Sequence, residues 1–286
     1  MPALVQPDLP TGRLSFTQID TYLTCPTRYK FKYIEKPELI PVGVSRLIGA
    51  SIHEIIAIVL SAKIGGVRAD LDKILADAHK RLADEFIKIN QNIENVTGIQ
   101  EPLTQAIMEM LHDQHDRLFK QWCTDVLPEF MPTAVEKQYE TTIGGYPFII
   151  YIDAIHAGKR VVDWKVTGSP KGKNQVDNSL QLSVYSIAAE VDEVAFCSLI
   201  RPKEGKERNW KPSVSMVTGR RTKADRDWAI SIVKSTAEAI RARNFPLCSP
   251  ENFLCSVKYC DFYPMCRGKQ KIETTAAQPS WMKAFV

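Results

Sequence analysis

The fold is decided by residues 147–166, which read PFIIYIDAIHAGKRVVDWKV. The β-branched and aromatic run that ends at Asp153 predicts one strand, and the apolar pair that leads into Asp163 predicts a second. Residues 157–159, Ala-Gly-Lys, offer a turn between the two runs. The stretch is therefore expected to form a β-hairpin that carries a carboxylate on each strand.

Three charged side chains of this hairpin are expected to lie together. Because side chains alternate between the faces of a strand, Asp163 and Lys165 point to the same face, and strand pairing brings Asp153 beside them. Two carboxylates in an apolar sheet repel each other and lose solvation unless a cation lies between them. A hard divalent ion such as Mg²⁺ suits such oxygen ligands, and the lysine can orient water or neutralise charge on a phosphate. A solvated hairpin end is the alternative for this motif alone.

Composition bounds the class of protein. The chain has 286 residues, of which 44% are hydrophobic and 24% charged, as in an ordinary soluble globular protein with one elaborated core or two small ones. The net charge of +4 permits nucleic-acid binding without requiring it. No apolar run approaches the roughly 20 residues of a membrane span, and the N-terminus lacks a leader pattern. The sequence therefore predicts a cytosolic protein without a membrane partner.

The seven cysteines are unevenly placed. Cys25 stands alone near the start, whereas four others fall within residues 248–266. In a cytosolic chain such crowding favours a metal site over disulfides. The close Cys-Xaa2-Cys pairs of structural zinc sites are absent from the sequence, and four thiolates can equally ligate a 4Fe-4S cluster. A buried small hydrophobe is the alternative reading of Cys25.

Hydrophobic periodicity and turn signals predict alternating helices and strands after a loose arm at residues 1–12. Predicted helices begin at Ser15, with a Ser15–Gln18 capping box, and at Ser51, Leu71, Glu101, Ser179 and Thr222. Predicted strands cover residues 134–142, 146–155, 160–166, 191–200 and 213–217. The helical stretch 67–130 carries no recognised chemical motif, and its His112 and His115 are assigned to packing and surface.

Two loops and the tail are candidate contact regions. Lys171 and Lys173 lie in a polar loop close to the proposed site, where phosphate contact competes with a merely solvated loop. A basic loop with a tryptophan follows at residues 201–211 and suits a single-stranded path. Residues 268–286 are predicted to be flexible, with an apolar tip that could dock on a protein partner.

Taken in order, these motifs resemble the PD-(D/E)XK nuclease superfamily, in particular the RecB-like branch with a C-terminal iron–sulfur cluster, which includes CRISPR-associated adaptation exonucleases and phage RecB-type exonucleases. The motifs that carry the resemblance are the opening around Cys25, Gly49-Xaa3-His53, Asp153 with Asp163-Xaa-Lys165, Gln181-Xaa3-Tyr185 and the C-terminal cysteines. The resemblance implies an α/β fold with a mixed central sheet flanked by helices. It implies a single domain at 13–267, with a helical insertion at about 67–130, a catalytic core at about 134–200 and a cysteine-ligated closure at 248–266.

The resemblance also implies roles for residues. His53, Asp153 and Asp163 would bind Mg²⁺ or Mn²⁺, and the two aspartates with Lys165 would carry catalysis. Gln181 and Tyr185 would position DNA. Cys25, Cys255, Cys260 and Cys266 would ligate a 4Fe-4S cluster, and Cys248 is the alternative to Cys255 because many family members space the first two C-terminal cysteines more closely.

The function implied is a metal-dependent deoxyribonuclease, an exonuclease rather than an endonuclease, that acts on single- or double-stranded DNA ends. It would work in recombination, repair, phage DNA processing or CRISPR adaptation, in the cytoplasm of a bacterium or phage host, and it could form a homo-oligomer. Two alternatives stay open: a non-catalytic DNA-binding or scaffold module that keeps the fold, and a zinc-stapled protein with an incidental acidic hairpin.

Overall fold

The protein is described from a computed structural model, which places residues 9–36, 44–92, 104–202, 210–256, 259–260 and 262–267. Three regions named above lie wholly or mainly outside the described residues. They are the first part of the N-terminal arm, most of the basic loop at 201–211 and the tail at 268–286.

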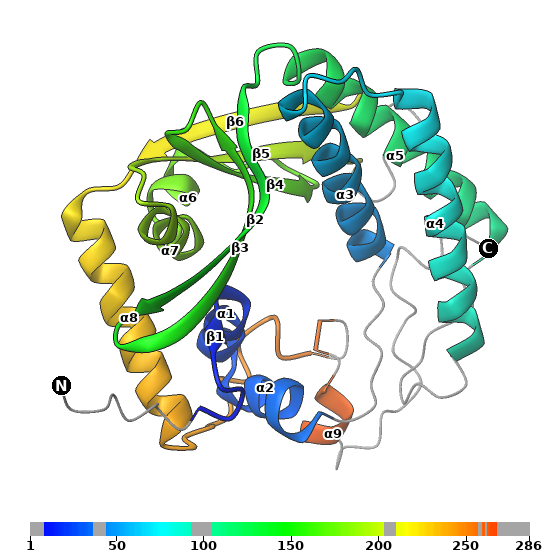
Figure 1. Ribbon diagram of the computed structural model, residues 1–286. Helices are drawn as coiled ribbons and strands as arrows, with labels where there is room; N and C mark the ends of the chain where they lie inside the picture. The colour runs from blue at the N-terminus through cyan, green and yellow to red at the C-terminus, as the bar shows by residue number, and fades with distance from the viewer. Residues whose placement is uncertain are drawn as a thin grey trace.

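A six-stranded mixed sheet forms the centre of the molecule, as the sequence predicts (Figure 1). The strand order is β1-β3-β4-β5-β6, and β2 pairs with β3 off this path. Pairing is parallel between β1 and β3 and between β4 and β5, and antiparallel elsewhere. The strands are β1 Leu14–Ser15, β2 Pro132–Ile143, β3 Tyr146–His156, β4 Arg160–Thr167, β5 Glu193–Ile200 and β6 Ser213–Arg220.

Helices cover both faces of the sheet (Figure 1). One face carries α3 Val44–Ile64, α4 Leu71–Asn92 and α5 Gln105–Asp125, and the other carries α6 Lys173–Asp177, α7 Leu180–Ala189 and α8 Lys223–Arg241. The remaining helical segments are α1 Phe16–Thr24, α2 Pro26–Tyr29, the π-helix η1 Lys30–Glu35 and α9 Tyr263–Arg267. The stretch 67–130, predicted to be helical, contains α4 and α5, which pack on α3.

A separate hydrophobic core lies on each face of the sheet. Ile52, Ile55 and Ile56 of α3 pack with Phe119 and Trp122 of α5 against the strands on one face. The second core joins the N-terminal helices, α7 and α8 to the other face; its buried members include Ile19, Tyr29, Ile152, Val184 and Val233. The sheet is therefore buried on both sides, which is how a sheet with parallel crossovers is stabilised.

The strands β3 and β4 pair over only a short length. Three residue pairs join them, Ala154↔Val162, Ile155↔Val161 and His156↔Arg160, whereas β4 pairs with β5 along its whole length. The other end of β3 pairs with β1 instead. The strands β3 and β4 therefore diverge at Asp153 and Asp163. We call this opening, with the neighbouring residues of β2, β3 and β4, the fork.

Two local predictions needed correction. Ser15 does accept a hydrogen bond from the Gln18 backbone N–H at 3.3 Å, but the Gln18 side chain donates to the Arg13 carbonyl at 3.2 Å and accepts from Tyr29. Only half of the predicted capping box is present, because the Gln18 side chain bonds to Arg13 and Tyr29 instead of the Ser15 backbone. The helix expected to start at Ser51 begins at Val44.

Helix α3 is more apolar than expected, since the sequence predicted no apolar run close to the length of a membrane span. Residues Leu47–Ile64 are long and apolar enough to span a membrane by length and composition alone. Ile52, Ile55 and Ile56 of this helix are fully buried in the core against α5 and the sheet. Packing in the core thus accounts for one face of the helix, whereas Ile58 and Ile64 are exposed.

Candidate active site

The fork brings together a histidine and two carboxylates from three elements. The ligand atoms of His53 on α3, Glu136 on β2 and Asp153 on β3 all lie within 4.8 Å of one another. His53 Nδ1 is 3.4 Å from Asp153 Oδ2. Imidazole and carboxylate groups at this spacing form a donor set that a divalent ion such as Mg²⁺ or Mn²⁺ can use.

Glu136 was not found from the sequence. It lies opposite Asp153 because the β2–β3 register pairs Val135 with Ala154 and Lys137 with Ile152. Its φ is 45°, in the left-handed region that costs a non-glycine residue about 1–3 kcal/mol and persists where the surrounding structure enforces it. Such strain beside two other ligand groups is typical of a functional position.

The register of this hairpin is fixed at its turn. Gly144 has φ +61°, and a Cβ there would lie 2.9 Å from Lys234 Cβ and 3.2 Å from the Ile230 carbonyl of α8. Only glycine fits both the backbone conformation and the contact. The turn pairs Ile143 with Tyr146, and the same register carried along the strands places Glu136 beside Asp153.

Asp153 occupies the point where β3 and β4 separate. Its Oδ2 accepts a hydrogen bond from the Trp164 backbone N–H at 2.8 Å. The carboxylate thus replaces the strand partner that Trp164 loses as β3 diverges. Asp153 is only 9% exposed, so its carboxylate is held rigidly at the edge of the fork.

Asp163 and Lys165 lie side by side on β4, as strand alternation predicts. Asp163 Oδ2 is 2.8 Å from Lys165 Nζ, and Gln181 Nε2 donates to Asp163 Oδ1 at 2.7 Å. Lys165 also donates to Gln181 Oε1 at 3.0 Å and stands 5.2 Å from the centre of the Phe196 ring. Gln181 thereby fixes the carboxylate and the ammonium group at once.

Tyr185 completes this chain of contacts on α7. Its hydroxyl lies 2.9 Å from Gln181 Nε2, one helical turn away. Burial, reinforced by the charge of Asp163, raises the pKa of Tyr185. The phenol is therefore neutral at working pH and serves as a polar support for Gln181.

The electrostatics of the fork favour a bound cation. Burial, then the charge of Asp153, raises the pKa of Asp163 to about 6. Partial burial and the same aspartate raise the pKa of Glu136. For His53 burial lowers the pKa, but the contact with Asp153 and the charge of Asp163 outweigh it, and the net shift is upward. Burial is the largest contribution in each case, and the neighbouring carboxylates push all three pKa values upward; a divalent ion would neutralise that negative charge.

One atom in the fork is under-satisfied. Asp163 is 2% exposed, and the polar contact of its Oδ2 among the described residues is the Lys165 ammonium group at 2.8 Å. A buried carboxylate oxygen with an incomplete shell is costly. Its presence beside the ligand group supports the fit of a cation to this site.

A cleft gives access to the ligand group. It has a volume of about 770 Å³ and is bounded by one face of α3 together with the fork. Its lining residues are Gly49, Ala50, His53, Glu54, Ala57, Ile58, Ser61, Glu136 and Asp153. The small residues of α3 leave room beside His53 for a substrate strand.

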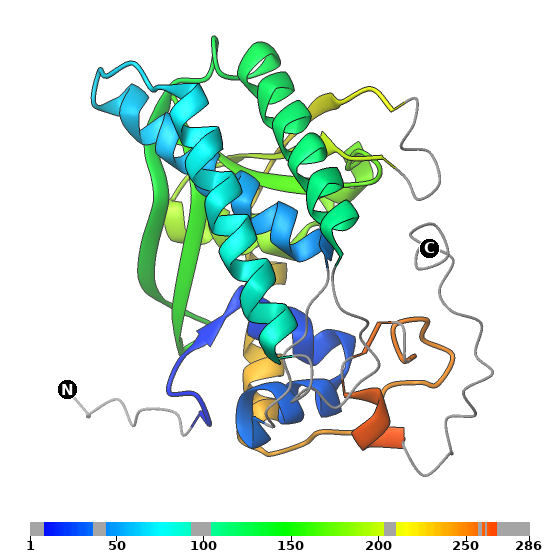
Figure 2. The ribbon, with the colours of Figure 1, turned by 90° about the vertical axis from the view of Figure 1, so that its right-hand side faces the viewer.

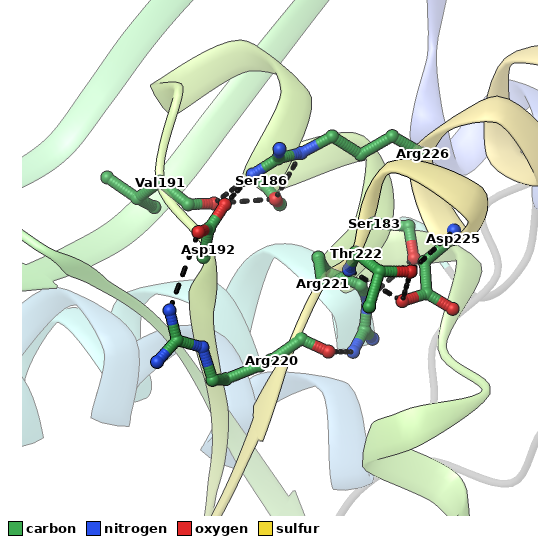
Figure 3. Close-up of polar contacts among 9 residues, drawn as sticks. All are labelled: Ser183, Ser186, Val191, Asp192, Arg220, Arg221, Thr222, Asp225 and Arg226. Atoms are coloured by element: carbon green, nitrogen blue, oxygen red, sulfur yellow. Dashed lines mark hydrogen bonds and ion pairs between the residues drawn. The ribbon is translucent and has the colours of Figure 1, made fainter.

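The back of α7 is anchored by buried arginine contacts (Figure 3). Arg221 is 3% exposed and donates to Ser183 Oγ at 2.7 Å and, through its other nitrogens, to the Val176 and Ser179 carbonyls. Arg226 donates to Ser186 Oγ at 3.2 Å and to the Val191 carbonyl. These contacts hold the helix that presents Gln181 and Tyr185 on its opposite side.

Lys171 and Lys173, predicted to share a polar loop, lie apart from the core site, and Lys173 is the first residue of α6 rather than a loop residue. The Lys171 backbone N–H donates to Ser198 Oγ at 3.1 Å, which ties the loop to β5. The Lys173 side chain forms an ion pair with Asp177 within α6. Among the described residues, neither lysine forms a hydrogen bond or an ion pair with a residue of the fork.

The predicted cysteine closure brings the two ends of the chain together. Five cysteines line a single pocket: Cys25, Cys248, Cys255, Cys260 and Cys266. Figures 1 and 2 both show α9 beside α2. Tyr22 donates to the Asn244 carbonyl at 2.6 Å, and the Phe31 and Phe262 rings stack at 5.7 Å. Both candidates for the second C-terminal ligand, Cys248 and Cys255, therefore stand at the pocket.

The chemistry of this pocket suits a metal group. Burial and the thiols of Cys25 and Cys255 raise the pKa of Cys248 to about 12, and burial raises that of Cys266. Without metal these two thiols are neutral, and a bound metal would have to displace their protons. Arg28 and Arg267 line the pocket and can balance thiolate charge.

Comparison with known proteins identifies the class. The family model of the PD-(D/E)XK nuclease superfamily matches residues 13–267. The chain therefore belongs to the PD-(D/E)XK nuclease superfamily, whose members use divalent metal ions. This agrees with the ligand group in the fork.

Solved structures agree with the fold. A chain from Eubacterium rectale named "Putative exonuclease" is 13% identical, with a TM-score of 0.50 over 95% of this chain and 92% of that chain. A second chain, SSO0001, is 15% identical over 89% of this chain and 95% of that chain, but its TM-score of 0.34 is too low to carry an argument. No curated protein sequence matches this chain.

Proposed function

We propose that this protein is a metal-dependent deoxyribonuclease that shortens DNA from its ends. The observation that carries the proposal is the group of His53, Glu136 and Asp153, with ligand atoms within 4.8 Å of one another, at a cleft beside the Asp163–Lys165 pair. The family membership supports a nuclease, and the likeness in fold to a protein named as an exonuclease favours action from an end.

Four side chains would hold the ion. His53, Asp153 and Asp163 are the predicted ligands, and the position of Glu136 adds a fourth candidate. Bound Mg²⁺ or Mn²⁺ supplies Lewis-acid polarisation of the phosphate and a more acidic water. Asp163 Oδ2 contacts the Lys165 ammonium group at 2.8 Å, and its remaining lone pair can be offered to the ion.

Lys165 would act on the nucleophile or on the phosphate. Its ammonium group is held by Asp163 at 2.8 Å and Gln181 at 3.0 Å. A cation fixed in this way needs no reorganisation when charge develops on phosphorus, which is the main source of electrostatic catalysis. Gln181 and Tyr185 position this group and the DNA strand, and Lys171 and Lys173 are candidates for phosphate contacts further along the strand.

The cysteine pocket would hold a 4Fe-4S cluster through Cys25, Cys255, Cys260 and Cys266, with Cys248 as the alternative to Cys255. Structural zinc sites usually have close Cys-Xaa2-Cys pairs, which this sequence lacks, whereas four thiolates can ligate a 4Fe-4S cluster. The cysteine spacing therefore favours the cluster. Its role would be to tie the N-terminal helices to the C-terminal segment.

The test uses end-labelled linear single-stranded DNA, linear double-stranded DNA and a closed circle, each with Mg²⁺ or Mn²⁺. The wild type is expected to degrade linear DNA only when metal is present, Lys165→Ala is expected not to, and the circle is expected to survive. Cutting of the circle would make the enzyme an endonuclease. DNA binding without cleavage by the wild type would replace the proposal with a DNA-binding scaffold.

A further inference from the structure

A second group of metal-ligating side chains lies in the helical layer, outside the active site. His79 of α4 and His115 and Asp116 of α5 place their ligand atoms within 4.8 Å of one another. His79 Nε2 is 2.6 Å from Asp116 Oδ1, and His115 Nδ1 is 3.7 Å from the same oxygen. Three donor atoms therefore converge between α4 and α5, in the stretch for which the sequence indicated no chemical motif.

His115 is the decisive residue of this group. Its side chain is fully buried, and its Nε2 lies 2.9 Å from Ser51 Oγ of α3. Its Nδ1 is buried and makes no hydrogen bond. If Nε2–H donates to the serine hydroxyl, the lone pair of Nδ1 points toward the group without a partner, and a buried polar atom in that state costs about 1–3 kcal/mol.

The protonation state fits a ligand. Burial, followed by the neighbouring His79, lowers the pKa of His115 to about 4. The ring is therefore neutral at working pH, and in the tautomer whose Nε2–H donates to Ser51 Oγ the Nδ1 lone pair is available to a ligand. A neutral imidazole whose other N–H donates to an oxygen is the arrangement found in protein metal sites.

We propose that His79, His115 and Asp116 bind a divalent transition ion of the zinc class. Two imidazoles and a carboxylate suit such an ion better than Mg²⁺, which prefers oxygen. Tetrahedral bonds of about 2.0–2.1 Å set ligand atoms about 3.3 Å apart. The His79–Asp116 pair would open by about 0.7 Å and the His115–Asp116 pair would close by about 0.4 Å from their present distances. Water would complete the coordination.

Neighbouring side chains support the ligands from outside. The His112 ring stacks on His79 with centroids 4.1 Å apart and planes 8° apart, which fixes the His79 ring. Lys120 Nζ is 3.9 Å from Asp116 Oδ2, the oxygen that faces away from His79 in these contacts. Ser51 stands two residues before His53 on α3. The ion would thus join α4 and α5 and, through Ser51, brace the helix that carries the active-site histidine.

The test measures bound zinc by elemental analysis, and the thermal shift on adding zinc chloride to chelator-treated full-length protein. His79→Gln and Asp116→Asn are the main variants, because both side chains are half-exposed and the replacements keep hydrogen bonding. Each is expected to hold one equivalent of zinc fewer than the wild type and to lose the matching part of the thermal shift. His156→Gln removes an imidazole outside the group and is expected to match the wild type in both readouts.

Ser51→Ala provides the finer test. It leaves the three ligands in place but removes the support of His115, and it is expected to weaken zinc binding about 10–100-fold. The cysteine pocket and the active site are unchanged in all these variants, so zinc held there cancels in the comparison. The proposal is overturned if His79→Gln and Asp116→Asn retain as much zinc as the wild type, or if these variants lose as much of the thermal shift given by magnesium chloride as of that given by zinc chloride.

Discussion

The active-site fork and the cysteine closure are built in different ways. In the fork, β2, β3 and β4 fix the charged residues through strand register, and Asp153 even takes the place of a strand partner for Trp164. In the closure, the described part of the C-terminal segment consists of the five-residue α9 and turns, held to α1, α2 and η1 by hydrogen bonds and ring contacts. Strand pairing positions the residues of the fork, whereas side-chain contacts hold the closure in place.

We therefore expect changes in the fork to affect activity and changes in the closure to affect stability. Changes in the fork remove charged groups from a scaffold that does not depend on them, so activity should fall while the fold persists. Changes in the closure remove ties that no sheet or long helix replaces, so stability should fall first. The predictions below test this division between activity and stability, from the largest expected effect to the smallest.

The largest expected effect is the loss of activity in Asp153→Asn. Cleavage should fall about 10²–10³-fold, the range for losing one group that acts on the transition state. The amide oxygen can still accept from Trp164 N–H, so the free energy of unfolding should change by less than about 1 kcal/mol. Cleavage rates and denaturant unfolding test both parts. Asp20→Asn, at an exposed position of α1, is the matched control.

Cys260→Ser should affect stability instead. The variant is expected to lose visible absorbance of the cluster and about 3 kcal/mol or more of unfolding free energy, as when a link that closes a long loop is cut. Absorption spectra and denaturant melts are the measurements. Cys123→Ala, which removes a thiol of α5 outside the pocket, should keep the spectrum. An unchanged spectrum in Cys260→Ser would remove that cysteine from the ligands.

Glu136→Gln tests the ligand that strand register adds. The concentration of Mn²⁺ needed for half-maximal cleavage should rise about 10–100-fold, because the carboxylate is lost while the shape of the side chain is kept. Glu140→Gln, on an exposed position of the same strand, should leave it unchanged. Equal metal requirements in both variants would return Glu136 to a structural role.

Asp163→Asn should give the smallest change in the free energy of unfolding, and the sign of that change is unusual. Because its pKa is raised to about 6, the folded protein binds a proton that the unfolded chain has already lost between about pH 4 and 6, and the charge destabilises the fold above that window. In EDTA the variant should be about 1 kcal/mol more stable than the wild type at pH 8, and the difference should vanish toward pH 4. Unfolding in urea at both pH values measures this; lower stability at pH 8 would contradict it.

Much of the fork follows from the sequence by strand alternation and turns. Asp163 and Lys165 fall on one face of β4, and Gln181 lies one helical turn before Tyr185, as predicted. Glu136 could also have been found. A two-residue turn at Gly144-Gly145 fixes Ile143 opposite Tyr146, and counting back along both strands gives Glu136 opposite Asp153.

Other features depend on long-range packing that a single sequence does not reveal. The divergence of β3 from β4 arises because β1, more than a hundred residues earlier, pairs with the far end of β3. His115 was assigned to packing or surface, and its burial and unpartnered nitrogen appear only when α3, α4 and α5 are packed together. The pairing of Cys25 with the C-terminal cysteines in one pocket likewise needs the whole fold.

The most direct test of the central claim compares wild type and Lys165→Ala for Mn²⁺-dependent cleavage of labelled linear DNA, at a Mn²⁺ concentration at which both proteins are shown to bind the ion. The account predicts that Lys165→Ala binds Mn²⁺ and remains folded but loses cleavage by about 100-fold or more. Cleavage at the wild-type rate by Lys165→Ala, or cleavage by the wild type without a divalent ion, would contradict the assignment of the fork as a metal-dependent nuclease site.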